Sequence, residues 1–160
     1  MADGVAGRLA GGIAIDDVRL EIRPSLPRST LTVRHAQVTV PASAVDLIVR
    51  SAPLPNGLQV SASLKAERLE VAVRASLLRV RIAFRPAVDR GYLVLTPSGG
   101  VPGLLLGLAA NMVSGRPGIT MSSDGQIRVD PRAVVPEGVT LPTGFTTVDV
   151  SQDRIVLTVG

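Results

Sequence analysis

Apolar and polar residues alternate with a period of two along most of this 160-residue chain. That pattern is typical of β-strands with one buried and one exposed face. The turn Asp89-Arg90-Gly91 separates two such runs and predicts a hairpin between them. The clearest runs predict strands at 58–64, 69–73, 78–84 and 92–96, with a closing hairpin at 146–159.

The alternation changes phase inside two of the longer runs. In one run the change falls at Asp16 and Asp17, and in the other it falls between Val33 and Ala36. A long strand that keeps its apolar residues on one face can change phase only where an extra residue is inserted or the chain bends. We therefore predict a bulge or a bend in each of these strands.

Two segments replace the alternation with a helical pattern. The first follows Pro41, carries apolar residues at helical spacing over 44–52 and ends at Pro53. The second, 102–114, begins with Pro102, and Gly115 follows its last residue. Proline is favoured in the first turn of a helix and glycine just beyond the end, so both segments have the expected boundaries.

The segment 102–114 (PGLLLGLAANMVS) contains almost no polar residue. A helix that is apolar on all sides must be covered on all sides, by protein, by lipid or by a partner. At roughly 1.5 Å per residue it spans about 20 Å, well short of the roughly 20 residues that a membrane-spanning helix needs. The segment is therefore not a transmembrane anchor, and what covers it bears directly on function.

A short turn is expected at 130–135, because Asp130 can cap a helix and Pro131 can occupy its first position. No repeat or low-complexity linker divides the chain. We therefore predict one α+β domain over residues 1–160, in which a long curved antiparallel β-sheet carries two helices on one face.

The composition restricts the function. Hydrophobic residues make up 46% of the chain but aromatic residues only 2%, so the core must be aliphatic. Single-strand nucleic-acid binders stack bases on aromatic side chains, and this chain has few of them, so we expect no nucleic-acid partner. The net charge is +4, and Lys65 is the one lysine among 17 basic residues. Arginine suits carboxylates and phosphates, which it can bind with two hydrogen bonds.

Three arginines, Arg79, Arg81 and Arg85, fall on the polar face of the strand predicted around 78–84. They could meet the phosphate groups of an anionic membrane or of another polyanion. Alternation alone predicts that they are the solvent face of a half-buried strand, with Glu67 and Glu70 on neighbouring strands as partners. Both interpretations stay open at the level of sequence.

The sequence offers little catalytic chemistry. His35 is the one histidine, there is no cysteine, and no G-x-S-x-G motif is present. The glycine-rich stretches lack the spacing or the lysine of a phosphate-binding loop. We expect no catalytic residues, no metal site and no cofactor, and hence a protein that is not an enzyme.

The C-terminal third carries a family resemblance. It contains GQIRVDP at 125–131, GVTLPTGF at 138–145 and VDVSQDRIVLTVG at 148–160. This succession of leucine-proline, glycine, strand, turn and strand resembles the LmeA-like family, bacterial cell-envelope proteins named after lipomannan elongation factor A. The upstream order of strands, short helix, meander and apolar helix is also similar, from about residue 5 onward.

The resemblance implies a fold similar to one half of the tubular lipid-binding (TULIP) superfamily, in which a curved sheet wraps a helix and lipid lies between them. It implies binding of a phospholipid or other acyl lipid and no catalytic residues. It also implies a membrane-associated protein, in the cytoplasm if the start of the chain is native and in the cell envelope or periplasm if an export signal was removed. By position, the residues lining the cavity would be Val45, Ile48, Val49, Leu104, Leu105, Leu108 and Met112.

Two hypotheses follow from the sequence. The leading one is a non-enzymatic lipid-binding or lipid-transfer module that contacts anionic membranes through arginine. The alternative is a structural or assembly protein whose apolar helix is buried in a homo-oligomer.

Overall fold

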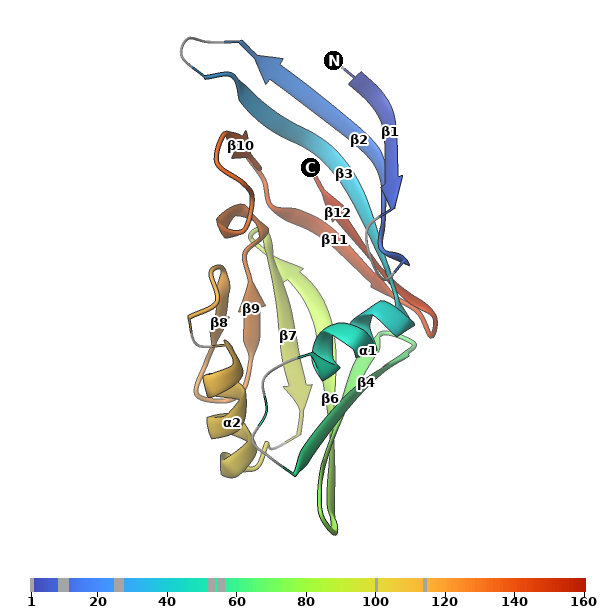
Figure 1. The fold of residues 1–160 in the computed structure, drawn as a ribbon, viewed down its shortest axis with the longest axis vertical. Coiled ribbons are helices and arrows are strands. Elements are labelled where there is room, and N and C mark those ends of the chain that lie inside the picture. The colour runs from blue at the N-terminus through green and yellow to red at the C-terminus, as the bar shows by residue number, and fades with distance from the viewer. Residues whose placement is uncertain are drawn as a thin grey trace.

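Two antiparallel β-sheets and two short helices make up the computed structural model, which describes residues 2–8, 12–24, 28–51, 54, 57–99, 101–113 and 115–160 (Figure 1). The predicted α+β class with antiparallel strands is confirmed. The strands form two sheets of six where the sequence suggested one continuous sheet. Alternation identifies a strand and its buried face, but the pairing of strands distant in sequence depends on the tertiary structure.

The first sheet occupies the upper part of Figure 1 and joins the two ends of the described chain. Its strand order is β1-β2-β3-β12-β11, and β10 pairs in parallel with the start of β3. Strand β1 was not predicted, because its sequence ADGVAGR does not alternate. The strands are β1 (Ala2–Arg8), β2 (Ala14–Arg23), β3 (Thr30–Pro41), β10 (Val139–Thr140), β11 (Phe145–Val150) and β12 (Arg154–Val159).

The second sheet has the order β4-β5-β6-β7-β9-β8, and its first four strands form a meander. Two-residue turns at 66–67, 76–77 and 90–91 connect β4 to β5, β5 to β6 and β6 to β7. Arg90 and Gly91 have φ values of 51° and 85°, so the predicted hairpin turn is confirmed. The strands are β4 (Leu58–Lys65), β5 (Arg68–Ala75), β6 (Leu78–Asp89), β7 (Tyr92–Ser98), β8 (Ile119–Met121) and β9 (Ile127–Val129).

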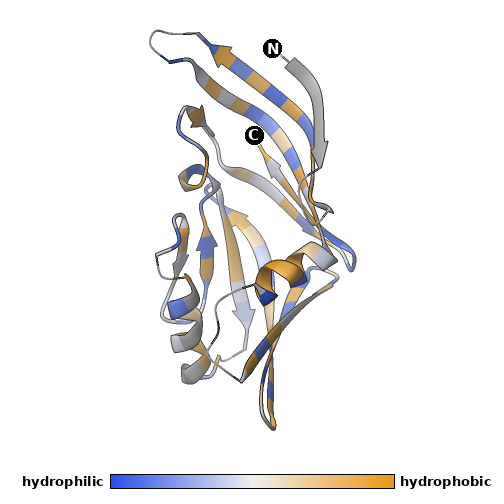
Figure 2. Ribbon diagram, in the orientation of Figure 1, coloured by the Kyte–Doolittle hydropathy of each residue, from blue (hydrophilic) through white to orange (hydrophobic). Residues whose placement is uncertain are grey.

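The bulge predicted in each of the two long strands is confirmed in the β2–β3 pair. Between Asp16 and Arg19, three steps of β2 oppose two steps of β3, and Asp17 has a φ of 50°. Between Arg19 and Leu20 the extra residue lies in β3 instead. Because each bulge shifts the register by one residue, the two bulges keep both phases of apolar residues on the same face of the sheet. Figure 2 shows the alternation of hydropathy along these strands.

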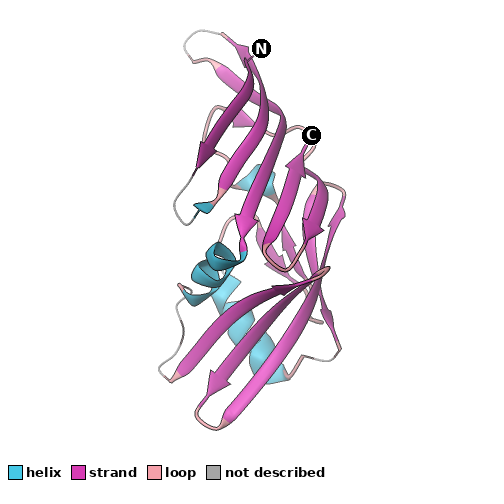
Figure 3. Cartoon of the chain, turned by 90° about the vertical axis from the view of Figure 1, so that its right-hand side faces the viewer, coloured by secondary structure: helices cyan, strands magenta, loops and turns pink. Residues whose placement is uncertain are grey.

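The helices lie where the sequence placed them. Helix α1 (Ala42–Arg50) begins after Pro41, and α2 (Gly103–Val113) begins after Pro102; Pro53 lies outside the described residues. The predicted turn is the 3₁₀-helix η2 (Pro131–Ala133), where the Asp130 carboxylate accepts a hydrogen bond from the Arg132 backbone N–H at 3.0 Å. In Figure 3, α2 runs behind the strands of the second sheet.

The buried core lies where the two sheets and α1 meet. Its central side chains are Val45, Leu64, Leu69, Phe84 and Val150, which come from α1, the second sheet and the first sheet. Backbone hydrogen bonds from Glu67 to Val150 and from Ala42 to Asp153 tie the same junction together. One hydrophobic cluster therefore belongs to both sheets.

Candidate functional site

The second sheet has a continuous apolar face. Its register places Val60 opposite Val73, and Val73 opposite Val80, so that alternate residues of three strands point to the same side. Val71 and Ile82 form the next pair on this face. Both helices lie on this side, as the sequence predicted for a pair of helices on one face.

Between this face and the helices lies an inner cavity of about 220 Å³, whose lining among the described residues is entirely apolar. Val71 and Phe84 line it from the sheet, Val49 from α1, and Leu105 and Ala109 from α2. Helix α1 contacts β4 at the edge of the sheet, and the inner cavity lies between this edge, the sheet face and α2.

An outer cavity of about 660 Å³ adjoins the inner one. Val73 and Leu105 line both cavities, so the two are neighbouring parts of one apolar space. The outer part extends to Leu78 at the start of β6 and to Gly103 at the start of α2. Asn111 contributes a polar side chain to its lining, and solvent reaches it along the exposed side of α2.

Helix α2 is held at one side and stands away from the sheet at the other. On the held side, a Cβ added at Gly125 would lie 3.0 Å from Leu106 Cδ2 and 3.4 Å from Val101 Cγ2, so the helix packs closely on the β8–β9 turn. On the open side, Gly103 and Gly107 line the outer cavity and have no heavy atom within 4 Å of an added Cβ. The small residues of α2 therefore maintain the space between helix and sheet.

Helix α1 is fixed by a side chain that the sequence analysis did not single out. Strand β4 is the edge of the second sheet, and its Ala62 N–H donates a hydrogen bond to Asp46 Oδ1 at 2.8 Å. Arg50 Nε donates to the other carboxylate oxygen at 2.7 Å. This attachment across the sheet edge turns Val49 toward the inner cavity.

The predicted lipid-lining residues have different positions. Val49 and Leu105 line the inner cavity, whereas Val45 belongs to the core cluster beside it. Ile48 was expected on the same apolar stripe, but its side chain is 53% exposed, because Asp46 sets the rotation of α1. The side chains of Leu104, Leu108 and Met112 lie outside the described part of the structure.

The lining residues that the sequence analysis missed include Ala109 and Val113 on α2. They follow Leu105 at four-residue intervals and share one helical face with it. Because α2 is apolar almost all round, its sequence gives no signal for which face points to the sheet.

The opposite face of the second sheet is cationic. Arg79, Arg81 and Arg85 are exposed there, as predicted from alternation. No described residue forms an ion pair with any of the three, and this includes Glu67 and Glu70, the partners suggested by the sequence. A cleft of about 490 Å³ on this face is lined by Arg50, Arg74 and Arg79 together with the polar residues Gln59 and Ser61.

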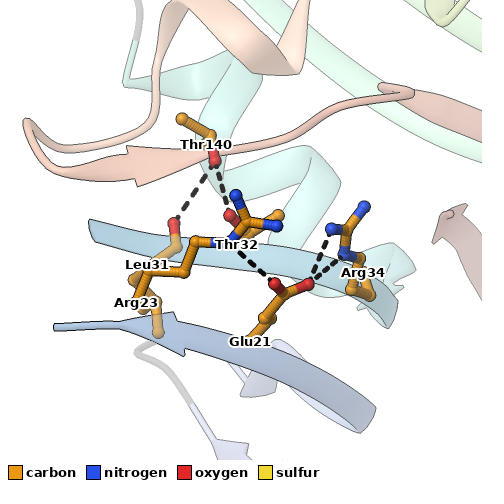
Figure 4. A network of polar contacts seen from close by, with 6 residues as sticks. All are labelled: Glu21, Arg23, Leu31, Thr32, Arg34 and Thr140. Atoms are coloured by element: carbon orange, nitrogen blue, oxygen red, sulfur yellow. Dashed lines mark hydrogen bonds and ion pairs between the residues drawn. The ribbon is translucent and has the colours of Figure 1, made fainter.

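The polar face of the first sheet, in contrast, has paired charges (Figure 4). Arg34 Nη2 and Arg23 Nε donate to the two carboxylate oxygens of Glu21, at 2.6 and 2.9 Å. The hydrogen bond from Arg34, followed by that from Arg23, lowers the pKa of Glu21 below its ordinary value. Thr32 and Thr140 bridge β3 to β10 at 3.1 Å. This network joins β2 to β3, and its hydrogen bonds use both carboxylate oxygens of Glu21.

His35 also has a structural setting. Its Nε2 lies 3.1 Å from Asp17 Oδ2 at the bulge, and its Nδ1 lies 3.3 Å from the Gly160 carbonyl oxygen.

Within the described ranges, His, Asp and Glu side chains form no group of three that could hold a metal ion. The described helices also include none with the length and apolar character to span a membrane.

Comparison of the chain with protein-family models, with curated proteins and with solved structures finds no match.

Proposed function

We propose that this protein binds one phospholipid or other acyl lipid without catalysis and carries it at a bacterial membrane or cell-envelope surface. The acyl chain would lie between the apolar face of the second sheet and the two helices. The observation that carries this proposal is the continuous apolar space bounded by Val49, Val71, Val73, Leu105 and Ala109.

Close packing is the rule in protein interiors, so a space of this size between a sheet and its covering helices needs a reason. The outer cavity of about 660 Å³ lies within the range of roughly 300–1,000 Å³ that small-molecule sites occupy. Water gains few hydrogen bonds from walls that are apolar, and an apolar ligand fits such walls better. An acyl chain has this chemistry and the elongated shape.

The polar end of the lipid would remain at the outer part of the space. Asn111 supplies a hydrogen-bonding side chain there, and Gly103 and Gly107 leave the backbone of α2 accessible. Buried acyl carbon contributes about 0.8 kcal/mol per CH₂ group, so a chain of ordinary length would bind with little help from its headgroup.

The test is binding of the fluorescent fatty acid cis-parinaric acid, together with native mass spectrometry and organic extraction of the purified protein. Ala109→Phe should fill the inner cavity and weaken parinaric acid binding by at least about tenfold, a loss of roughly 1.4 kcal/mol. The matched control is Ser43→Phe, which places the same ring on an exposed position of α1.

The proposal fails if the wild-type protein binds no parinaric acid and carries no extractable lipid, or if both variants lose binding equally. A ligand-free oligomer in the native mass spectrum would overturn it in favour of the homo-oligomer hypothesis. In that case α2 would be an interface helix, and Ala109→Phe would change the oligomer mass.

A further inference from the structure

The β5–β6 hairpin ends in an apolar tip. Its two-residue turn is Ser76-Leu77; Leu77 is fully exposed and Leu78 is 58% exposed. The tip is the lower extreme of the molecule in Figure 1, away from the first sheet. The turns at 66–67 and 90–91 occupy the other end of the meander and carry Ala66-Glu67 and Arg90-Gly91. Two adjacent leucines in water at the end of a hairpin are costly unless they meet an apolar partner.

Three arginines without an ion-pair partner among the described residues lie directly behind this tip. Arg74 on β5 and Arg79 on β6 are cross-strand partners, and Arg81 follows on the same face. Like charges placed opposite each other destabilise a sheet, and no described residue neutralises either side chain with an ion pair. Arg50 also lines the cleft that Arg74 and Arg79 line, but its guanidinium is paired with Asp46. This arrangement is complementary to a layer of anions.

We propose that the β5–β6 hairpin docks the protein on an anionic phospholipid membrane. Leu77 and Leu78 enter the apolar boundary of the bilayer, and Arg74 and Arg79 bind lipid phosphates just above them. Guanidinium groups suit this contact because each can donate two hydrogen bonds to one phosphate.

The tip is also the entrance to the apolar space. Leu58, Ala75 and Leu78 lie side by side at the same end of β4, β5 and β6, and all three line the outer cavity. A membrane-inserted tip would therefore bring the outer cavity to the acyl layer, so that a chain could pass between them without crossing water. This last step rests on the proposed function; the docking itself does not.

The arginines on this face lie at different distances from the hairpin tip. Arg79 follows Leu78 directly, whereas Arg85 lies seven positions from Leu78 along β6, or about 23 Å at roughly 3.3 Å per residue. Charges are screened over about 8 Å at physiological ionic strength. If the hairpin enters the membrane tip first, Arg85 therefore contributes little to membrane binding, although it lies on the same face of β6 as Arg79.

The first test is co-sedimentation with vesicles of phosphatidylcholine containing phosphatidylglycerol, and with vesicles of phosphatidylcholine alone. The wild-type protein should favour the anionic vesicles, and added salt should weaken binding. The double variant Arg74→Gln with Arg79→Gln should bind roughly 10- to 30-fold more weakly. Leu77→Asp should lose about tenfold or more, and Arg85→Gln should bind like the wild type.

The second test uses the absence of tryptophan from the chain. Leu77→Trp introduces a single tryptophan at the tip, whose emission should shift to the blue on anionic vesicles and be quenched by brominated lipid. Leu47→Trp is the matched control, because Leu47 is 59% exposed on α1 and should stay in water.

Docking by the tip is overturned if the wild type binds neither vesicle or both equally, if Arg85→Gln loses as much as the double variant, or if Leu77→Trp is not quenched. It is also overturned if Leu77 instead mediates dimerisation, which sedimentation velocity of Leu77→Asp would show. Parinaric acid binding in solution should be unchanged in Leu77→Asp. The two proposals can therefore fail separately: the cavity is tested by parinaric acid binding, and the docking surface is tested by vesicle binding.

Discussion

The carboxyl group of Glu21 has a lower pKa in the folded protein than in the unfolded chain. Hydrogen bonds from Arg34 and Arg23 lower its pKa from the ordinary 4.5, because they stabilise the carboxylate. A carboxylate with a lowered pKa stabilises the fold above its unfolded pKa, and that contribution is lost as the pH falls through the folded value. Glu21 should therefore help to hold β2 against β3 at neutral pH and cease to do so in acid.

This predicts a difference in acid sensitivity. Glu21→Gln should lower the melting temperature at neutral pH, and the gap to the wild type should close as the pH falls below about 4.5. Thermal melting followed by circular dichroism at a series of pH values measures this gap. Glu70→Gln is the control, since Glu70 forms no ion pair with a described residue. A gap that stays constant down to strong acid would contradict the role of Glu21.

At the residue scale, local chemistry was predictable and long-range contact was not. Asp130 and Pro131 were expected to start a short helix, and they do, because capping depends on residues next to each other in sequence. The bulge at Asp17 was likewise visible in the alternation. Ile48 was misplaced because the hydrogen bond between Asp46 and Ala62, 16 residues apart, sets the rotation of α1.

Among the elements, α1 is attached to the edge strand β4 through the side chain of Asp46. Asp46→Ala would leave the part-buried Ala62 N–H without its acceptor and should cost about 1–3 kcal/mol of unfolding free energy. Urea denaturation measures the loss. Asp46→Asn keeps an acceptor oxygen and should lose less.

The same substitution has a second consequence for the cavity. If Asp46 orients α1, Asp46→Ala should also weaken parinaric acid binding, because Val49 would no longer be held against the inner cavity. Equal stability of the alanine, asparagine and wild-type proteins would show that the edge contact does not hold the helix.

Element boundaries were largely set by proline and glycine. Pro41 and Pro102 precede α1 and α2, and Gly115, with a φ of 76°, follows α2. The orientation of α2 was not predictable, because nearly every residue of the helix is apolar. The contact of Leu106 and Val101 with Gly125 fixes that orientation, and it depends on a turn that lies more than ten residues farther along the chain.

For the whole molecule, the junction cluster predicts that the two sheets unfold together. Phe84 is buried in a cluster that includes Val150 of the first sheet and Val45 of α1. Phe84→Ala should destabilise the protein by about 3–5 kcal/mol through lost burial and a new void. Because the cluster contains side chains from both sheets, Phe84→Ala should destabilise both sheets.

Hydrogen exchange measures this coupling. Amide protection in β3 and in β6 should fall together in Phe84→Ala, with one urea transition. Ile22→Ala is the control, since Ile22 is 63% exposed at the end of β2 and its removal should change little. Loss of protection confined to the second sheet would show that the sheets fold independently.

By itself, the sequence determined the antiparallel α+β class, the bulges, the hairpin turn at Arg90-Gly91 and the position of both helices, because alternation, capping and turn chemistry act between near neighbours. Only the tertiary structure decided that the strands form two sheets and that α2 stands away from one of them. It also decided that the leucines at the tip of the β5–β6 hairpin lie beside arginines that form no ion pair with a described residue. These features depend on the pairing and packing of distant segments, where the free energy of burial is shared among residues that no local pattern connects.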